Sequence, residues 1–211
     1  MNKPYSIVFE DEQLIVADKS AGLLVIPTPA GEKHTLTDLL NRDLTAKGEA
    51  VRAHPCHRLD RETSGLILYA KGKSAQQTMM EQFHKHQIKK KYICFAQGYI
   101  KTGPDNWVDI KSPLEGKHAL TRYRVAKLDL RGFSVVEVEP ETGLTNQIRL
   151  HFKAIGHPLV GERRFSYAKD FALKFRRVAL HATYLGFRHP ITNEQLEFTS
   201  PLPEDMADFA E

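Results

Sequence analysis

Asp60 is the side chain in this sequence best placed to do chemistry. It lies in the stretch HRLDRETSGLILYAK, between Arg58 and Arg61, and an apolar run begins at Leu66. An ionised carboxylate can act as a nucleophile, stabilise an oxocarbenium-like sugar or remove a proton. A loop aspartate can equally be structural, pairing with a neighbouring arginine or capping a turn. On these residues alone the structural role is favoured, so the rest of the chain has to decide.

Other kinds of catalytic site leave no motif in the chain. It contains no GxxxxGK[ST] or GxGxxG phosphate loop, no HExxH and no GxSxG. His54, Cys56 and His57 fit no standard zinc spacing. Cys56 and Cys94 form no CxxC pair, which favours two reduced thiols in a cytosolic protein. We therefore expect no cofactor and no metal, so that in an enzyme a side chain would have to do the chemistry.

Positive charge is concentrated in three places, although the net charge is only +4. The basic clusters are residues 85–92, 163–164 and 174–177, and aromatic residues lie in or beside them. Such clusters suit a phosphate backbone, although any single one could be an ordinary solvated surface. Taken together, the three clusters make nucleic-acid binding as good an interpretation as an ordinary solvated surface. No apolar run approaches the roughly 20 residues of a membrane-spanning helix, and the first twelve residues do not resemble a signal peptide. A cytoplasmic protein without membrane contact is expected.

The elements that must position Asp60 can be read from periodicity and turn signals. Residues 66–70 form a continuous apolar strand that should be covered on both faces. Two hairpins are expected, and a capping box at Ser74 should begin a helix that ends near Lys85. The expected elements are strands 6–10, 14–18, 66–70, 92–97, 121–128, 133–139, 178–187 and 195–199, with helices 35–47, 74–85 and 144–155. Adjacent strand pairs predict an α+β fold with a mixed, largely antiparallel sheet and flanking helices.

The stretch HRLDRETSGLILYAK resembles the signature of the RluA-type pseudouridine synthases, which isomerise uridine within RNA. Further blocks resemble that family in the same order along the chain. They are LIVADKSAGL at 14–23, KKYICFA at 90–96, TGLTNQIRLH at 142–151, IGHPLVG at 155–161, LHA at 180–182 and HP at 189–190. The resemblance implies the pseudouridine synthase fold with a central cleft. It also implies a single catalytic domain over residues 1–211, without a separate N-terminal RNA-binding domain.

The resemblance assigns roles to individual residues. It implies that Asp60 is the essential catalytic aspartate, that Tyr92 stacks on the target base and that Arg149 pairs with Asp60. Arg58 would occupy the space left by the flipped nucleotide. From the residues alone, Tyr92 could instead be a core tyrosine and Arg149 an exposed helix residue. Further RNA contacts are expected from Lys89, Lys90, Lys91 and Asn146.

The chain departs from the family pattern on both sides of Arg149. Leu144 and Asn146 replace an arginine and a histidine, and the segment GERRFS at 161–166 replaces GDxxYG. The leading interpretation is an enzyme that isomerises a uridine in an rRNA or tRNA stem-loop, acting as a monomer without an obligatory protein partner. One alternative is a non-catalytic RNA-binding protein or RNA chaperone on the same fold. Another is a hydrolase of small glycosides or nucleosides, which lacks an evident second catalytic acid.

Overall fold

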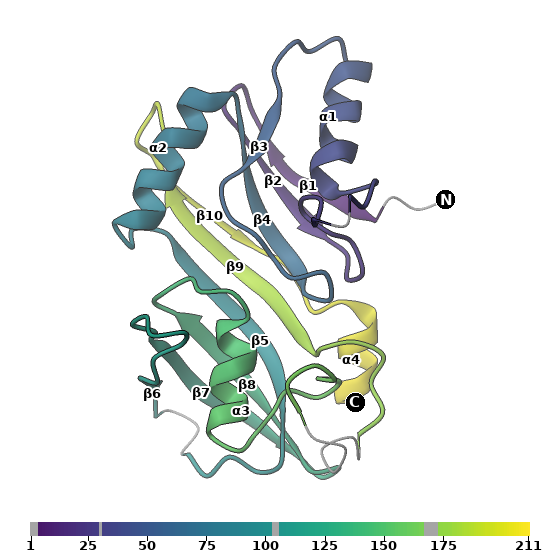
Figure 1. Cartoon of the computed structure of the whole chain (residues 1–211), viewed down its shortest axis with the longest axis vertical. Helices are drawn as coiled ribbons and strands as arrows, with labels where there is room; N and C mark the ends of the chain where they lie inside the picture. The colour runs from purple at the N-terminus through teal and green to yellow at the C-terminus, as the bar shows by residue number, and fades with distance from the viewer. Residues whose placement is uncertain (1–3, 30, 103–105, 167–172) are drawn as a thin grey trace. The chain divides into compact units, whose positions relative to one another are not determined.

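The computed structural model describes residues 4–29, 31–102, 106–166 and 173–211 (Figure 1). The chain divides into two compact units. Unit 1 comprises Met1–Lys89 and Tyr184–Ser200, and unit 2 comprises Lys90–Thr183 and Pro201–Glu211. Strand β9 (Leu180–Arg188) therefore begins in unit 2 and ends in unit 1.

Unit 1 is a small sheet with two helices. Its elements are β1 (Tyr5–Glu10), β2 (Leu14–Lys19), α1 (Leu36–Ala46), β3 (Ala53–Pro55), β4 (Ser64–Lys71), α2 (Lys73–His84), the end of β9 and β10 (Gln195–Thr199). Strands β1, β2 and β4 are antiparallel neighbours in that order, β3 pairs with the far end of β4, and β10 pairs with β9. The predicted opening hairpin and the apolar strand are both confirmed.

The core of unit 1 explains why β4 is so apolar. All eight of its residues are buried, and Leu66 and Leu68 pack in one cluster with Leu14, Val16 and Met79. Burying these apolar side chains stabilises the strand by about 25 cal/mol for each Å² of apolar surface removed from water. The sheet therefore offers a rigid base for the loop that precedes β4.

The two helices of unit 1 begin in different ways. Thr35 and Asp38 form a reciprocal capping box at the start of α1, as an N-cap threonine should. The capping box predicted at Ser74 is wrong, because α2 starts directly after Gly72 without a side-chain cap. Gly72 has a positive φ of 89° and turns the chain straight from β4 into the helix. The predicted end of the helix at Lys85 is confirmed.

In its described residues, unit 2 is an antiparallel sheet with one helix from the middle of the chain and one from its end. Its elements are β5 (Lys89–Gln97, whose first residue belongs to unit 1), β6 (Val108–Ile110), β7 (Thr121–Asp129), β8 (Phe133–Pro140), α3 (Gln147–Ala154), the start of β9 and α4 (Glu204–Ala210). The strand order is β5-β8-β7-β6, with every pairing antiparallel. The core includes Phe95, Phe133 and Val160, and Met206 and Phe209 of α4 pack on it.

The structure confirms an α+β fold with a largely antiparallel sheet. Strands β3 and β6, with three residues each, and helix α4, with seven, were not predicted. Helix α3 begins at Gln147, three residues later than the predicted stripe. The central cleft and the single catalytic domain stay predictions. None of the described helices has the length and apolarity to cross a membrane.

Candidate active site

Asp60 lies in the loop between β3 and β4. Cys56 donates its N–H to the Leu68 carbonyl (3.0 Å), and Leu68 returns its own N–H to Nε2 of His57 (3.0 Å). Thr63 N–H donates to the Asp60 carbonyl at 3.1 Å, which closes a turn. Asp60 as a whole is partly exposed. The buried strand thus fixes the backbone of a loop whose aspartate is not fully enclosed.

The same loop is also held by the segment that follows β2. The Arg61 carbonyl accepts hydrogen bonds from the Gly22 N–H (2.7 Å) and from the Lys19 ammonium (3.2 Å). Lys19 is completely buried and also donates to the carbonyls of Ser20 and Leu23. A buried ammonium needs such partners, since an unpaired one would be costly. The residues resembling the family's opening segment therefore support the Asp60 loop.

Tyr92 lies on β5, opposite Val138 of β8. Only 8% of its surface is exposed. Lys90 is two residues earlier and so lies on the same face of the strand. A Cβ placed on Gly143 would lie 3.8 Å from Lys90 Nζ, so Lys90 reaches the loop before α3. Burial lowers the pKa of the Lys90 ammonium, and the nearby charge of Glu141 partly opposes that shift.

Arg149 lies on α3 and is buried, with 7% of its surface exposed. Its Nε and Nη2 donate to the two carboxylate oxygens of Glu162 at 2.6 and 3.0 Å. Its Nη1 donates to Oδ1 of Asn146 at 2.7 Å, and its Cζ lies 4.9 Å from the centre of the Phe165 ring. A bidentate pair of this kind is both strong and directional. Arg149 is therefore not the exposed helix residue that its sequence context also allowed.

Glu162 is the partner of Arg149 that the sequence did not predict. It is fully buried, and its Oε1 also accepts the N–H groups of Arg164 (2.8 Å) and Phe165 (3.1 Å). Burial alone would raise the pKa of Glu162, but the hydrogen bonds and charge of Arg149, with the two backbone donors, lower it below its usual value. Glu162 therefore carries its charge at neutral pH. An acidic residue after Gly161, at the aspartate of the family pattern GDxxYG, was the one available signal.

A chain of buried hydrogen bonds attaches α3 to β7. His151 Nε2 lies 2.9 Å from the Ser112 carbonyl, which can only accept, so Nε2 carries the proton. His151 Nδ1 then accepts from the Thr121 hydroxyl (2.8 Å), and that hydroxyl accepts from Gln147 Nε2 (2.9 Å). Gln147 Oε1 accepts from Thr142 Oγ1 (2.7 Å). The block TGLTNQIRLH thus supplies Arg149 together with the polar side chains that hold its helix.

The predicted site residues are distributed over both units. Unit 1 contains Arg58, Asp60 and Lys89, and unit 2 contains Lys90, Lys91, Tyr92, Asn146 and Arg149. The structure brings Asn146 and Arg149 together directly. Lys91 is paired with Glu139 at 3.2 Å, whereas Arg58 and Lys89 are exposed. The contact of Asp60 with Arg149 and the stacking role of Tyr92 stay predictions.

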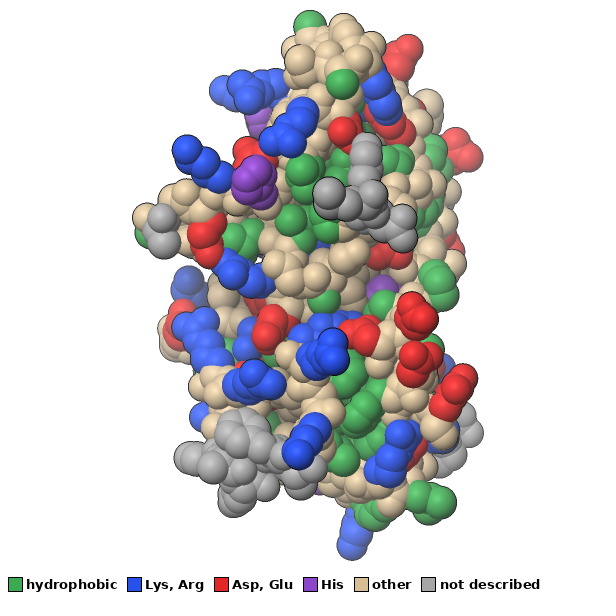
Figure 2. Space-filling view, turned by 90° about the vertical axis from the view of Figure 1, so that its right-hand side faces the viewer, with side chains coloured by type: hydrophobic (Ala, Val, Ile, Leu, Met, Phe, Trp, Pro, Cys, Tyr) green, Lys and Arg blue, Asp and Glu red, His purple; other side chains and the backbone are tan. Residues whose placement is uncertain are grey.

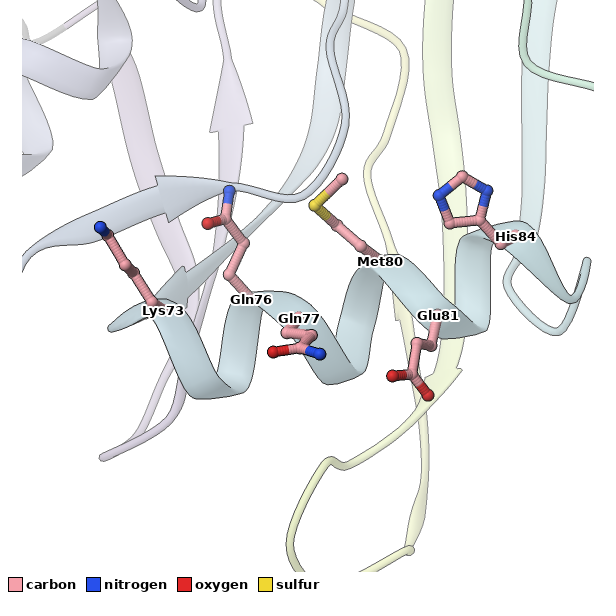
Figure 3. A pocket seen from close by; sticks show the side chains of 6 residues that line it. All are labelled: Lys73, Gln76, Gln77, Met80, Glu81 and His84. Carbon is pink, nitrogen blue, oxygen red and sulfur yellow. The ribbon is translucent and has the colours of Figure 1, made fainter.

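A surface pocket follows helix α2 (Figure 3). It is lined by Lys73, Gln76, Gln77, Met80, Glu81 and His84. Figure 3 shows Gln76, Met80 and His84 on one side of the helix and Gln77 and Glu81 on the other. Gln76 is occupied in a hydrogen bond to the Pro55 carbonyl (3.0 Å). None of the six lining residues belongs to the predicted site, so this pocket is not evidence for it.

The thiols and possible metal ligands are not arranged for chemistry in the part of the chain that is described. Cys56 and Cys94 are free and buried, and burial raises the pKa of Cys56 to about 12. Within residues 4–29, 31–102, 106–166 and 173–211, no group of three or more His, Cys, Asp or Glu side chains could hold a metal ion.

Comparison with known proteins decides the family. The family model described as RNA pseudouridylate synthase matches residues 13–154, which is more than half of the chain. The chain belongs to the RNA pseudouridylate synthase family. This confirms the resemblance to RluA-type synthases. As a member of this family, the protein is an isomerase that acts on RNA.

Relatives in this family align with nearly the whole chain. Ribosomal large subunit pseudouridine synthase D of Zymomonas mobilis is 34% identical, and the alignment covers 96% of this chain and 71% of that protein. The uncharacterized RNA pseudouridine synthase YlyB of Bacillus subtilis is 35% identical, with 97% and 71% covered. Human RNA pseudouridylate synthase domain containing 1 has a solved structure that superposes with a TM-score of 0.75 at 26% identity, covering 94% of this chain and 84% of that one. The matched segment of the family model contains Asp60, Tyr92 and Arg149 but ends before Glu162.

Proposed function

We propose that the protein isomerises one specific uridine in a structured rRNA or tRNA to pseudouridine, with Asp60 as the catalytic carboxylate acting on a flipped-out nucleotide. Several relatives bear the name ribosomal large subunit pseudouridine synthase D. Their names favour large-subunit ribosomal RNA as the first substrate to examine. RNA as the substrate class follows from the family, whereas the particular RNA and uridine are part of the proposal.

The observation that carries this proposal is the construction of the Asp60 loop. The loop backbone is fixed on one side by β4 and on the other by Gly22 and Lys19, while Asp60 stays partly exposed. A catalytic group needs this combination, because a displacement of about 1 Å can cost a hundredfold in rate. The geometry therefore supports a chemical role for Asp60.

The reaction requires three changes within one nucleotide. The bond between N1 and C1′ breaks, the uracil turns over, and C5 bonds to C1′. C5 then loses its proton while N1 gains one, so uridine and pseudouridine have the same composition. An ionised Asp60 can attack C1′, stabilise an oxocarbenium-like sugar or remove a proton, as carboxylates do in glycosidic chemistry. In the proposal, Arg149 pairs with the Asp60 carboxylate through charge-assisted hydrogen bonds and holds it in place.

Binding of RNA is proposed to combine stacking with phosphate contacts. Tyr92 would stack on the extruded base, and Arg58 would fill the gap left in the RNA, which offsets the few kcal/mol that base flipping costs. Lys89, Lys90, Lys91 and Asn146 would contact the flanking nucleotides. Figure 2 shows Lys and Arg side chains gathered on part of one face, where they can meet phosphates. RNA affinity should consequently fall steeply as salt concentration rises.

The proposal is tested by restoring a modification in cells. The wild-type protein and Asp60→Ala are expressed in a host from which its own synthases of this family have been deleted, and pseudouridines are mapped in total RNA. The expected result is at least one uridine that is modified by the wild type and not by Asp60→Ala. Asp109→Ala is the matched control, since Asp109 is a surface aspartate paired with Lys111 and Arg122.

Two outcomes would contradict the proposal. Modification of the same uridine by Asp60→Ala would exclude Asp60 as the catalytic carboxylate. RNA binding without any restored modification would favour the alternative of a non-catalytic RNA-binding protein or RNA chaperone. Because Leu144 and Asn146 depart from the family pattern, RNA binding is measured together with modification in order to test that alternative.

A further inference from the structure

We propose that Glu162 is a positioning residue for catalysis, because it fixes the orientation of the Arg149 guanidinium. This inference rests on the proposed function, in which Arg149 acts on Asp60. Glu162 lies outside the segment that the family model matches, and its role is therefore read from the contacts in this structure.

The donors of Arg149 are divided between different acceptors. A guanidinium has five N–H donors in one plane. Two of them, on Nε and Nη2, meet the carboxylate of Glu162, and one on Nη1 meets Asn146. These three bonds also fix the direction of the other N–H group on each Nη atom, because all five N–H groups lie in one plane.

Glu162 itself is held so that it cannot turn with Arg149. It is fully buried, and the N–H groups of Arg164 and Phe165 bind its Oε1. The preceding residue, Gly161, packs so closely that a Cβ there would lie 1.8 Å from the Arg177 carbonyl oxygen. The backbone that carries Glu162 is thus fixed on both sides of the carboxylate.

The face of the guanidinium is also restrained. The Phe165 ring lies against it, with 4.9 Å from the ring centre to Cζ, and favours a flat cation–π arrangement. Glu162 fixes the direction in which the Nε edge of the Arg149 guanidinium points, while Phe165 fixes the plane of that group. With both fixed, the guanidinium has one orientation, as a preorganised catalytic site requires.

The test is a double-mutant cycle on the purified protein. Glu162→Gln, Arg149→Ala and the double variant are assayed for single-turnover pseudouridine formation in a large-subunit ribosomal RNA transcript, and for binding to the same transcript. Glu162→Gln keeps the size of the side chain but replaces one oxygen by an NH₂ group that faces the arginine donors. We expect its rate to fall about a hundredfold, as for a misplaced catalytic group, with binding of the transcript unchanged. In the Arg149→Ala background the same change should cost nothing further.

Other results would overturn the inference. A wild-type rate in Glu162→Gln would show that orientation by Glu162 is unnecessary. Equal losses from Glu162→Gln in both backgrounds would show that it acts through the fold and not through Arg149. If Glu162→Gln does not fold, Glu162→Asp supplies the same cycle, since it keeps the charge but shortens the reach. A wild-type protein that forms no pseudouridine in the large-subunit transcript or in total RNA is a separate readout, and it would overturn the proposed function together with this inference.

Discussion

The loop that carries Asp60 is anchored by apolar packing and backbone hydrogen bonds, whereas the segment that carries Arg149 is anchored by buried polar side chains. Strand β4 is buried along its whole length, and Leu68 binds the Asp60 loop through its backbone N–H and carbonyl. Around Arg149 the anchors are instead Glu162, Gln147 and His151. The Asp60 loop is stabilised by packing and backbone hydrogen bonds. The Arg149 segment is stable only while each of its hydrogen-bond partners is present.

This difference determines how each region should respond to mutation. In apolar packing, the unfolding free energy that a substitution removes grows with the number of buried atoms deleted, so a small change of shape costs little. A buried polar network behaves differently, because removing one partner leaves another without its hydrogen bond in a low-dielectric interior. The Arg149 segment should therefore be the more sensitive to the loss of a single polar group and to pH.

The largest expected effect is that of Arg149→Ala. The variant leaves the Glu162 charge buried without its partner, which typically costs about 3–5 kcal/mol in unfolding free energy. The pKa of Glu162 is lowered in the native protein, so the pair stabilises fully above the unfolded pKa and loses this effect as pH falls through the lower native value. Urea unfolding at neutral pH and near pH 4 should show the gap between variant and wild type closing in acid. A gap that is small at neutral pH would contradict the account.

Gly161→Ala should have the next largest effect. Its new Cβ would meet the Arg177 carbonyl at 1.8 Å, so the backbone beside Glu162 must move, at a cost of about 3 kcal/mol. Gly156→Ala is the matched control, because Gly156 has a similar φ of +82° but nothing within 4 Å of a Cβ. Its cost should be about 1 kcal/mol from backbone strain alone. Equal losses of unfolding free energy in the two variants would show that the close contact is unimportant.

A pair of isosteric exchanges compares the two regions directly. Thr121→Val removes no volume but takes hydrogen bonds from His151 and Gln147, and should cost about 2 kcal/mol in unfolding free energy. Val16→Thr places a hydroxyl opposite Leu68 in the apolar cluster and should also cost about 2 kcal/mol. Chemical denaturation of both variants measures these losses. If Thr121→Val were neutral, the polar anchoring of the Arg149 segment would be refuted.

The smallest expected effect is a pH dependence from His151. Burial lowers its pKa, and the Ser112 carbonyl only partly opposes that shift. The unfolded chain then takes up a proton near pH 6.5 that the native protein does not, so stability falls as pH drops below about 6.5. Thermal unfolding between pH 7 and pH 5 should show a smaller decline in His151→Gln than in the wild type. His118→Gln, at an exposed position, should keep the wild-type slope; equal slopes in all three proteins would contradict this role of His151.

The sequence predicted the Asp60 region better than the Arg149 region, for physical reasons. The run from Leu66 to Ala70 and the alternation in the hairpins are local signals of burial, so the elements could be placed to within a few residues. The Thr35 cap of α1 was equally local. In contrast, the start of α3 was missed because Asn146 adopts a left-handed φ of 55° and the Gln147 side chain binds back to the Leu144 N–H.

The contacts made by the supporting residues of the site could not be predicted from the sequence. Glu162 lies 13 residues from Arg149, and Thr121 lies 30 residues from His151. Only folding brings such pairs together, and no periodicity connects them. The family motifs located Asp60, Tyr92 and Arg149 without showing what holds them. The structure added the anchors, among them Lys19 under the Asp60 loop and Glu162 beside Arg149.

The central claim is that the Asp60 carboxylate does the chemistry on a framework that does not depend on it. Single-turnover pseudouridine formation by purified wild type and Asp60→Ala, on the RNA identified by mapping, tests this claim most directly. We expect no detectable product with Asp60→Ala, and an RNA affinity and a melting temperature close to those of the wild type, because the loop is held by its backbone. Product formation at a wild-type rate by Asp60→Ala would contradict the claim.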